Sequence, residues 1–517
     1  MATTKGNQTL ATALRKLKRL QDRNQGVVEH SDLDDFDRAI LVDAGFLRPV
    51  IRGWYVFSSP ADAPGDSTHW YATYWAFLAG FLSKRFGKNY CLNPEASIFL
   101  HTGNTAIPRQ VVAATGAGGA SNYELPFSTS LMVYPAPKNI SPSRVETRGL
   151  QTYSLPEALC RVGPQFFKSS PREAEIALTM VRSAAELLPF LVEGDTLPSA
   201  AARLAGAFQF MDRPADAAMI VNAFARLPLG TRTKIQPVNP FDRTQPTLLS
   251  TRERSPYALR IRSLWADWRE TVITTFPPAP GLSQDSEAYL HEIDDRYVED
   301  AYNSLSIEGY RVTDALIELV ASGQWNPDGD TEQAKTRDAL AARGYYQAFL
   351  VVKKSIARVL AGEAVSEVVR VDHQEWYAQL FDPSVKAGIL DQRDLIGYRT
   401  GPIFIRNSMH TPVPREAILD SLEALFDLIA NEPEASVRAV LGHHLFVFIH
   451  PYFDGNGRTG RFLMNTLLAS GGYPWTVIRV ERRAQYMQAL ESASVKGDIL
   501  PLAQFIAEEM QSWKAEE

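Results

Sequence analysis

A short run near the C-terminus concentrates residues that can bind phosphate. It extends from His450 to Arg461 and reads HPYFDGNGRTGR. Gly455 and Gly457 allow the backbone to curl, so that successive N–H groups converge on an anion at the start of a helix whose dipole also favours negative charge. Arg458 and Arg461 are three residues apart, so both guanidinium groups can reach a chain of phosphates. The run therefore predicts a polyphosphate site.

Three further side chains of the run add reactive chemistry. Asp454 is a hard oxygen ligand, suited to a Mg²⁺ ion that keeps most of its waters and bridges phosphate oxygens. Asn456 can donate a hydrogen bond to a phosphoryl oxygen. His450 can take a proton near neutral pH, as a general base on an attacking hydroxyl. Each residue alone has an ordinary structural explanation, but together they predict nucleotidyl or phosphoryl transfer.

The elements that must position this run are helical. One predicted helix spans residues 436–449 and a second begins near Arg458. Helical periodicity dominates from Glu287 to the end of the chain, with an extended segment near residues 403–405. The part that carries the chemistry is therefore expected to be mainly α-helical.

The first sixty residues predict a different kind of domain. Leucines recur at helical spacing over residues 10–20 with basic residues on the other face, and residues 46–57 predict two strands around an Arg52-Gly53 turn. This order predicts a winged helix, in which Arg48 and Arg52 could contact DNA phosphates. Residues 1–55 hold nine basic and seven acidic residues, so packing or dimerisation is an equal alternative.

Composition sets limits on the whole chain. Its 517 residues are 45% hydrophobic and 22% charged with a net charge of −6, which excludes disordered, collagen-like and supercharged classes. The two cysteines, Cys91 and Cys160, predict buried thiols and a reducing compartment. The start of the chain has no secretory h-region, and the richest apolar stretch, residues 70–82, is shorter than the roughly 18 residues of a membrane span. We expect a cytoplasmic protein with no membrane contact.

The expected fold class is multidomain α+β, because the length corresponds to three or four folding units at about 150 residues each. Proline-rich residues 236–285 are expected to connect two halves, with a helix at 257–271. The predicted parts are a winged-helix-like domain (1–60), a mixed α/β middle domain (61–235), the connector (236–285) and a helical C-terminal domain (286–517).

Residues 450–461 match the signature of the Fic family, His-Pro-Phe-x-Asp-Gly-Asn-Gly-Arg-x-x-Arg, with Tyr452 in place of Phe. The resemblance extends over about residues 287–517. It implies transfer of AMP from ATP to a Ser, Thr or Tyr hydroxyl of a protein, with release of pyrophosphate. His450 would deprotonate the hydroxyl and Asp454 would hold Mg²⁺. The nucleotide would be held by Gly455, Asn456, Gly457, Arg458 and Arg461.

The same resemblance implies further roles. Gly457 stands where the related Doc phosphotransferases have Lys, which favours AMP transfer. Tyr486 occupies the position of an aromatic near the adenine, although a core tyrosine on an amphipathic helix has the same pattern. Residues from Gly397 to Pro412 resemble the family's flap, a β-hairpin whose Ile403, Phe404 and Ile405 would hold a target peptide by strand addition.

Residues 304–309, SLSIEG, resemble the Fic inhibitory motif. Ser304, Glu308 and Gly309 match its defined positions. The resemblance implies that Glu308 pairs with Arg461 and blocks the γ-phosphate position, because a carboxylate in a guanidinium fork removes a phosphate ligand. The alternative is an ordinary solvated Glu before a C-capping Gly.

Residues 1 to about 230 resemble abortive-infection type IV antitoxins, through Gly45-Phe46-Leu47 followed by Arg52-Gly53-Trp54-Tyr55. DNA is therefore a candidate partner besides ATP and a protein target, and homo-oligomerisation is left open. Competing interpretations are a nucleotide-sensing DNA-binding regulator and a Glu308-dependent enzyme that removes AMP. Transfer of UMP or phosphocholine also stays open.

Overall fold

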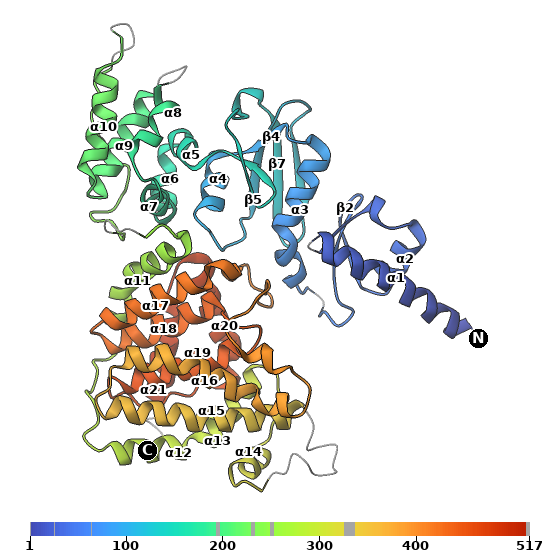
Figure 1. Ribbon diagram of the computed structural model, residues 1–517, viewed down its shortest axis with the longest axis vertical. Coiled ribbons are helices and arrows are strands. Elements are labelled where there is room, and N and C mark those ends of the chain that lie inside the picture. Colours follow the sequence, from blue (N-terminus) through green and yellow to red (C-terminus); the bar gives the residue numbers. More distant parts are fainter. Residues whose placement is uncertain are drawn as a thin grey trace. The chain divides into compact units, whose positions relative to one another are not determined.

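The chain forms two compact units. The computed structural model (Figure 1) describes residues 2–24, 26–63, 65–192, 197–228, 233–248, 253–324 and 337–512. The first unit comprises Met1–Leu259 with Ile403–Thr411, and the second comprises Arg260–Pro402 with Pro412–Glu517. The division falls inside α11 (Pro256–Thr275), the helix expected within the connector.

Two findings concern membrane crossing and the cysteines of the described residues. None of their helices combines the length and the apolar content that a membrane crossing requires. Cys91 and Cys160 are buried free thiols, as predicted.

The first unit begins with two helices and a small antiparallel sheet. Its elements are α1 (Ala2–Asn24), β1 (Val27–Glu29), the short 3-10 turn η1 (His30–Asp32), α2 (Asp35–Asp43), β2 (Leu47–Ile51) and β3 (Trp54–Phe57). The strand order is β1-β3-β2. The predicted hairpin is confirmed, with Gly53 at a φ of 84° in its turn, where glycine is favoured. Ala13 and Leu17 of α1 pack with Val28, Leu41 and Leu47 in the core of this part.

A four-stranded mixed sheet follows, in the order β4-β5-β7-β6. β5 and β7 pair in parallel, and the outer strands pair antiparallel to them. Aromatic residues of α3 pack into the same core as the sheet, which explains the apolar stretch in the sequence. The elements are α3 (Thr68–Phe86), β4 (Tyr90–Leu92), α4 (Pro94–His101), β5 (Gln110–Thr115), β6 (Ser121–Leu125), β7 (Thr129–Pro135), η2 (Pro137–Asn139), β8 (Val145–Thr147) and β9 (Leu150–Thr152).

The alanine-rich stretch predicted as helical forms short helices around a separate apolar cluster. Proline occupies the first turn of most of them, where its missing N–H leaves no helical bond unmade. They are α5 (Leu155–Arg161), α6 (Pro164–Ser169), α7 (Pro171–Met180), η3 (Ala184–Glu186), α8 (Leu188–Val192), α9 (Pro198–Phe210) and α10 (Pro214–Ala225).

The second unit is helical in its described part, as predicted. α15 and α16 run side by side as a long hairpin (Figure 1), and α18 packs closely on α19. The helix expected from Glu287 is divided at Arg296 into α12 and α13. The helices are α12 (Ser286–Asp295), α13 (Tyr297–Ile307), α14 (Asp314–Ala321), α15 (Arg337–Leu360), α16 (Val365–Lys386), α17 (Ile418–Asn431), α18 (Ala435–Ile449), α19 (Asn456–Ala469), α20 (Arg483–Glu491) and α21 (Leu500–Ser512). Short turns lie at η5 (Gln392–Leu395), η6 (Arg415–Ala417), η7 (Val480–Arg482) and η8 (Ser492–Lys496).

The close approach of α15 to α16 depends on Gly344, because a Cβ there would lie 2.0 Å from the Leu380 carbonyl oxygen. We predict that Gly344→Ala lowers the free energy of unfolding of the second unit by about 1–3 kcal/mol, although Ala is the better helix former. Calorimetric melting of the full chain measures this. Gly119→Ala is the control, since a Cβ at Gly119 meets nothing within 4 Å. An unchanged melting temperature for Gly344→Ala would show that the two helices separate without strain.

Candidate active site

His450 ends α18 in a conformation and a protonation state suited to a base. Its φ of 56° and ψ of 62° are left-handed, which turns the chain sharply out of the helix. Its Nδ1 lies 3.1 Å from the Val447 carbonyl oxygen. Since a carbonyl can only accept, Nδ1 carries the proton of the neutral ring and Nε2 keeps its lone pair. Desolvation lowers the pKa of His450 to about 4, and the Arg399 guanidinium acts in the same direction. The imidazole is therefore neutral at pH 7.

Arg399 holds the loop after His450 through hydrogen bonds with backbone carbonyl oxygens. Its backbone N–H donates to the Pro451 carbonyl at 2.9 Å and its Nε to the His450 carbonyl at 2.7 Å. Its two terminal nitrogens donate to the Gly401 and Val413 carbonyls. Burial lowers the pKa of Arg399 to about 10. Nothing in the sequence marks this arginine as a residue that holds the loop.

The loop closes on the start of α19 through Asn456. The Asn456 side-chain oxygen accepts from Tyr452 N at 2.9 Å, and its nitrogen donates to Tyr452 O at 2.8 Å. This side chain thus holds the loop, and the predicted hydrogen bond to a phosphate is not what its geometry favours. Gly455 precedes the helix at a φ of 77°, and a Cβ there would lie 2.8 Å from the Phe381 ring. Both the curl and the close approach require glycine.

Arg458 and Asp454 lie on this same loop and helix start. Arg458 is 1% exposed and lies between the rings of Tyr310 and Phe381, at 5.2 and 5.0 Å from their centroids. Asp454 is 57% exposed, and its Oδ1 accepts from Gly455 N at 2.6 Å and lies 3.4 Å from Arg458 Nη2. The rings fix the guanidinium plane, while the carboxylate stays accessible to a ligand.

Arg461 is held by residues of α13 and its C-terminal end, as the resemblance to the inhibitory motif predicts. Its Nη2 donates to Glu308 Oε1 at 2.8 Å and to the Ser304 carbonyl at 3.1 Å, and its Nε donates to Ser304 Oγ at 2.8 Å. Burial would lower the pKa of Arg461, but the Glu308 carboxylate raises it above its ordinary value. A Cβ at Gly457 would lie 2.3 Å from Glu308 Oε1. The carboxylate therefore occupies the N-terminus of α19, where an anion would otherwise bind.

The position of Glu308 is set by the end of α13. Gly309 has a φ of 88° and reverses the chain directly after Glu308, so that Tyr310 N donates back to the Leu305 carbonyl at 3.1 Å. Arg483 Nε donates to the Ile307 carbonyl at 2.7 Å and fixes the helix end. Glu308 keeps 27% of its side chain exposed, so solvent reaches the ion pair.

Tyr486 lies in the core. It is 1% exposed, its hydroxyl lies 2.7 Å from His443 Nε2, and its ring stacks on Phe505. This placement gives both Tyr486 and His443 a packing and hydrogen-bonding role. The structure gives no support to stacking of Tyr486 on an adenine, because its ring faces are covered.

The predicted flap differs from a β-hairpin. Residues 402–405 form neither helix nor strand, and in this segment only His410 makes a β-bridge, to Ala106. Ile403 and Ile405 are half-buried, and Phe404 is exposed.

The segment Ile403–Thr411 is instead bound within the first unit. Arg406 Nε lies 3.1 Å from Asp66 Oδ2, and Asn407 N donates to Thr68 Oγ1 at 3.0 Å. Ile107 N donates to the Met409 carbonyl at 2.9 Å. These bonds hold the turn at Arg406, Asn407 and Met409 within the first unit. Its role in target docking stays a prediction.

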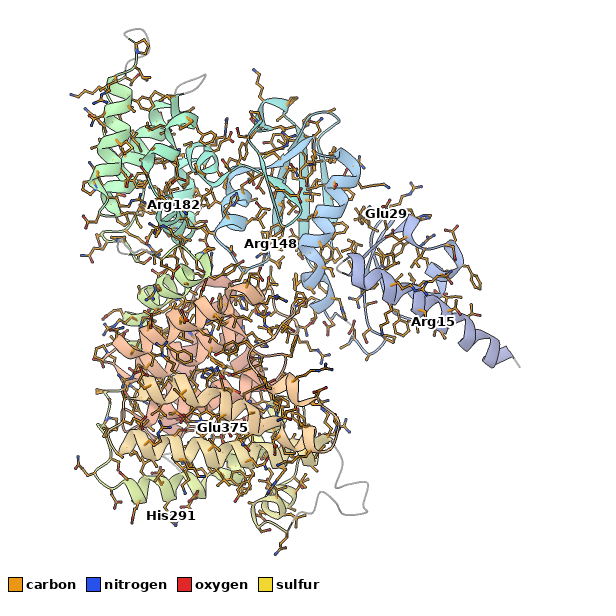
Figure 2. The ribbon with its side chains drawn as sticks, viewed as in Figure 1. Arg15, Glu29, Arg148, Arg182, His291 and Glu375 are labelled. Atoms are coloured by element: carbon orange, nitrogen blue, oxygen red, sulfur yellow. The ribbon has the colours of Figure 1, made fainter. Side chains whose placement is uncertain are left out.

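The basic residues expected to contact DNA are partly used inside the first unit. Lys16 pairs with Asp34 and Asp37, and Arg48 Nη1 donates to the Asp66 carbonyl at 2.9 Å. Arg15 (Figure 2) is exposed and contacts its own helix, and Arg52 is exposed at the hairpin turn. DNA binding stays a prediction, with fewer free cations than the sequence alone suggests.

Comparison with known proteins agrees with the geometry of the second unit. Residues 370–468 match the Fic/DOC family model. This part of the chain is a Fic domain. The match lies outside residues 1–235, so the winged helix and the antitoxin resemblance stay predictions.

Relatives of the chain carry names of one enzyme class. The chain is 31% identical over 118 residues to protein adenylyltransferase fic-1 of Caenorhabditis elegans, covering 22% of this chain and 23% of the relative. It is 39% identical over 114 residues to protein adenylyltransferase Fic of Nematostella vectensis, covering 21% and 26%. The chain therefore spans about a quarter of the length of these two relatives. A solved structure of Fic-1 from C. elegans covers 68% of this chain and 97% of that chain at 17% identity and a TM-score of 0.37, too low a score to carry an argument.

The one departure from the Fic signature has a structural consequence. Tyr452 is buried, and its ring stacks on Tyr377 with centroids 3.7 Å apart and planes at 4°. Its hydroxyl is buried with no hydrogen-bond partner among the described residues. The aromatic packing expected of the family's Phe is retained, and the added oxygen is left unsatisfied.

We predict that Tyr452→Phe stabilises the Fic domain, because a buried polar group without a partner costs about 1–3 kcal/mol. The melting temperature of the full chain should rise by about 2–4 °C for each kcal/mol gained. Tyr473→Phe is the matched control and should lower it, since the Tyr473 hydroxyl donates to the Pro277 carbonyl at 2.6 Å. A lower melting temperature for Tyr452→Phe would mean that its hydroxyl has found a partner.

Proposed function

We propose that the chain is a protein adenylyltransferase that transfers AMP from ATP to a hydroxyl of a protein, held inactive by Glu308. The observation that carries the proposal is the convergence, at the start of α19, of a neutral histidine base and of an arginine already occupied by a carboxylate. The names of the relatives in the Fic family support the reaction class.

The proton transfer follows from the tautomer of His450. Because Nδ1–H is fixed on the Val447 carbonyl, Nε2 is the atom that takes the proton from the target hydroxyl. The hydroxyl oxygen then bonds to the α-phosphorus, and the bond from that phosphorus to the bridging oxygen breaks. Pyrophosphate leaves with that oxygen, and the AMP remains on the protein. Donors fixed in advance around the phosphates stabilise the charge that develops in this step.

The residues of the loop fit the triphosphate and a magnesium ion. The N–H groups at the start of α19 lack helical acceptors and can hold a phosphate, with Arg458 and Arg461 beside them. Mg²⁺ binds proteins through one or two carboxylates plus substrate phosphates, and the exposed Asp454 supplies one such carboxylate. When bound, Mg²⁺ would neutralise phosphate charge.

We expect inhibition because the Glu308 carboxylate and a terminal phosphate of ATP compete for the same position beside Arg461. Glu308 Oε1 lies on Arg461 and over Gly457, so a terminal phosphate and the carboxylate cannot share this position. A terminal phosphate and the Glu308 carboxylate are both negatively charged, so they would repel each other at this position. Both would also need the same hydrogen-bond donors. ATP could then bind only with its phosphates displaced from the productive arrangement.

The proposal predicts that Glu308→Gly increases incorporation of α-labelled AMP, into the chain itself or into target proteins in a lysate. A charge-assisted hydrogen bond contributes about 1.5–3 kcal/mol, so we expect a rise of about ten- to a hundredfold. Glycine is tolerated here because Glu308 follows the last residue of α13.

Glu363→Gly is the control for this experiment. It removes an exposed carboxylate that pairs with Arg358 instead of a motif arginine, and should leave labelling at the wild-type level. Equal labelling by Glu308→Gly and wild type would remove Glu308 from an inhibitory role. Release of AMP from pre-labelled protein that depends on Glu308 would instead favour the reverse reaction.

A second prediction concerns His450. In the Glu308→Gly background, His450→Ala should reduce transfer about 10²- to 10⁴-fold, the range for loss of a general base, while ATP binding measured by calorimetry persists. With His450 intact, the rate should be level near neutral pH and fall as the pH drops through about 4, where the base becomes protonated. Undiminished transfer by His450→Ala would assign the base elsewhere.

A further inference from the structure

The first unit contains a cavity of about 640 Å³, far along the chain from the Fic motif. It lies at the carboxyl ends of the parallel strands β5 and β7, where Ala114 and Tyr134 are partners in the register and both line it. The ends of parallel strands are common ligand sites in sheets with helices packed on them. The volume is within the usual range for a small-molecule site.

Two arginines supply the charge of the cavity wall. Arg203 Nη2 donates to the Val162 carbonyl at 2.7 Å, and its guanidinium lies 5.7 Å from the Phe167 ring centroid. Its Nε is buried without a hydrogen-bond partner among the described residues, and no carboxylate there forms a salt bridge with it. Arg161 donates through Nε to Glu157 at 2.7 Å and keeps 41% of its side chain exposed. Arg203 is half-buried and this burial lowers the pKa of its guanidinium, so an anionic ligand would stabilise the charged form.

The start of α9 adds to the same potential. Pro198, Ser199 and Ala200, the first turn of α9, line the cavity. The N–H groups of Ser199 and Ala200 precede the first helical hydrogen bond and favour an anion. Asn93 and Pro94, at the start of α4, line it as well, but the Asn93 side chain already accepts from Ala96 N and donates to the Glu95 carboxylate. The positive charge and partial positive charge therefore come from two elements, α5 with Arg161 and α9 with Arg203 and its first turn.

No acidic residue balances this charge among the lining residues that the structure describes, since none of them is Asp or Glu. Glu157 lies nearby, but its two oxygens accept from Arg161 and from the Ser141 hydroxyl. Cys160 lines the cavity as a neutral thiol, because burial raises its pKa to about 12. Tyr134 and Asn139 add polar groups that can bind the rest of a ligand.

We propose that this cavity binds a small phosphate monoester, with the phosphate on Arg203, Arg161 and the first turn of α9. A phosphate matches the planar forks of two guanidinium groups and a helix N-terminus at once. The proposal does not depend on the proposed activity of the Fic domain. It gives the first unit a ligand-binding role of its own.

The test is calorimetric titration of the full chain with inorganic phosphate and with glycerol 3-phosphate at millimolar concentration, which lack the base of a nucleotide. Arg203→Gln should weaken binding of both about ten- to a hundredfold, the effect of losing one charge-assisted contact. The matched control is Arg226→Gln, which removes the same charge from an exposed position after α10 that does not line the cavity. It should bind as wild type does.

Two further variants make the outcome decisive. Gly163→Leu adds a side chain at a lining position where a Cβ meets no atom within 4 Å, and it should weaken binding even if Arg203→Gln does not fold. Arg461→Gln should leave phosphate binding by the first unit unchanged. The proposal is wrong if wild type does not bind, if both cavity variants bind as wild type, or if binding is lost only with Arg461→Gln. Displacement of the phosphate by duplex DNA in an Arg203-dependent way would identify a nucleic-acid backbone as the ligand and would also overturn it.

Discussion

A guanidinium buried away from water must have a partner, and the Fic domain is organised around this requirement at Arg461. With its charge on the first turns of α19, Arg461 can be satisfied by a phosphate that arrives or by a carboxylate that is already present. α13 supplies the carboxylate, together with a hydroxyl and a carbonyl. Since the two anions exclude each other, one arginine would serve both the proposed transfer and its suppression.

The need of Arg461 for an anionic partner also explains the roles of three neighbouring residues. Gly457 leaves room for Glu308, and Gly309 turns the chain so that Glu308 faces Arg461. Arg483 holds the end of α13 through the Ile307 carbonyl. Removing any of these contacts would change the balance between the two anions without touching a reacting atom.

The sequence predicted the parts of the site that depend on local spacing. The helix before His450 and the helix after Gly455 follow from motifs a few residues long. The pairing of Glu308 with Arg461, which lie 153 residues apart, was implied only by the family resemblance. Contacts that depend on tertiary packing were not predictable in this way. The sequence does not distinguish an asparagine that holds a loop from one that binds phosphate. The hydrogen bonds of Asn456 to Tyr452 are visible only in the structure.

Hairpins elsewhere in the chain were also only partly predictable from the sequence. The hairpin at Arg52-Gly53 was predictable because a turn residue specifies it, whereas the loss of the expected flap hairpin was not. Hydrogen bonds that Arg406 and Asn407 donate to the distant residues Asp66 and Thr68 determine how this segment runs. Periodicity within that segment carries no information about partners more than three hundred positions earlier in the chain.

The nine residues Ile403–Thr411 therefore make the protein hard to divide by cutting its gene once. A recombinant fragment starting after Leu259 would keep these residues and lose their partners in the rest of the first unit, including the backbone of Ile107 and Thr105. The complementary fragment would expose the donors and acceptors left behind.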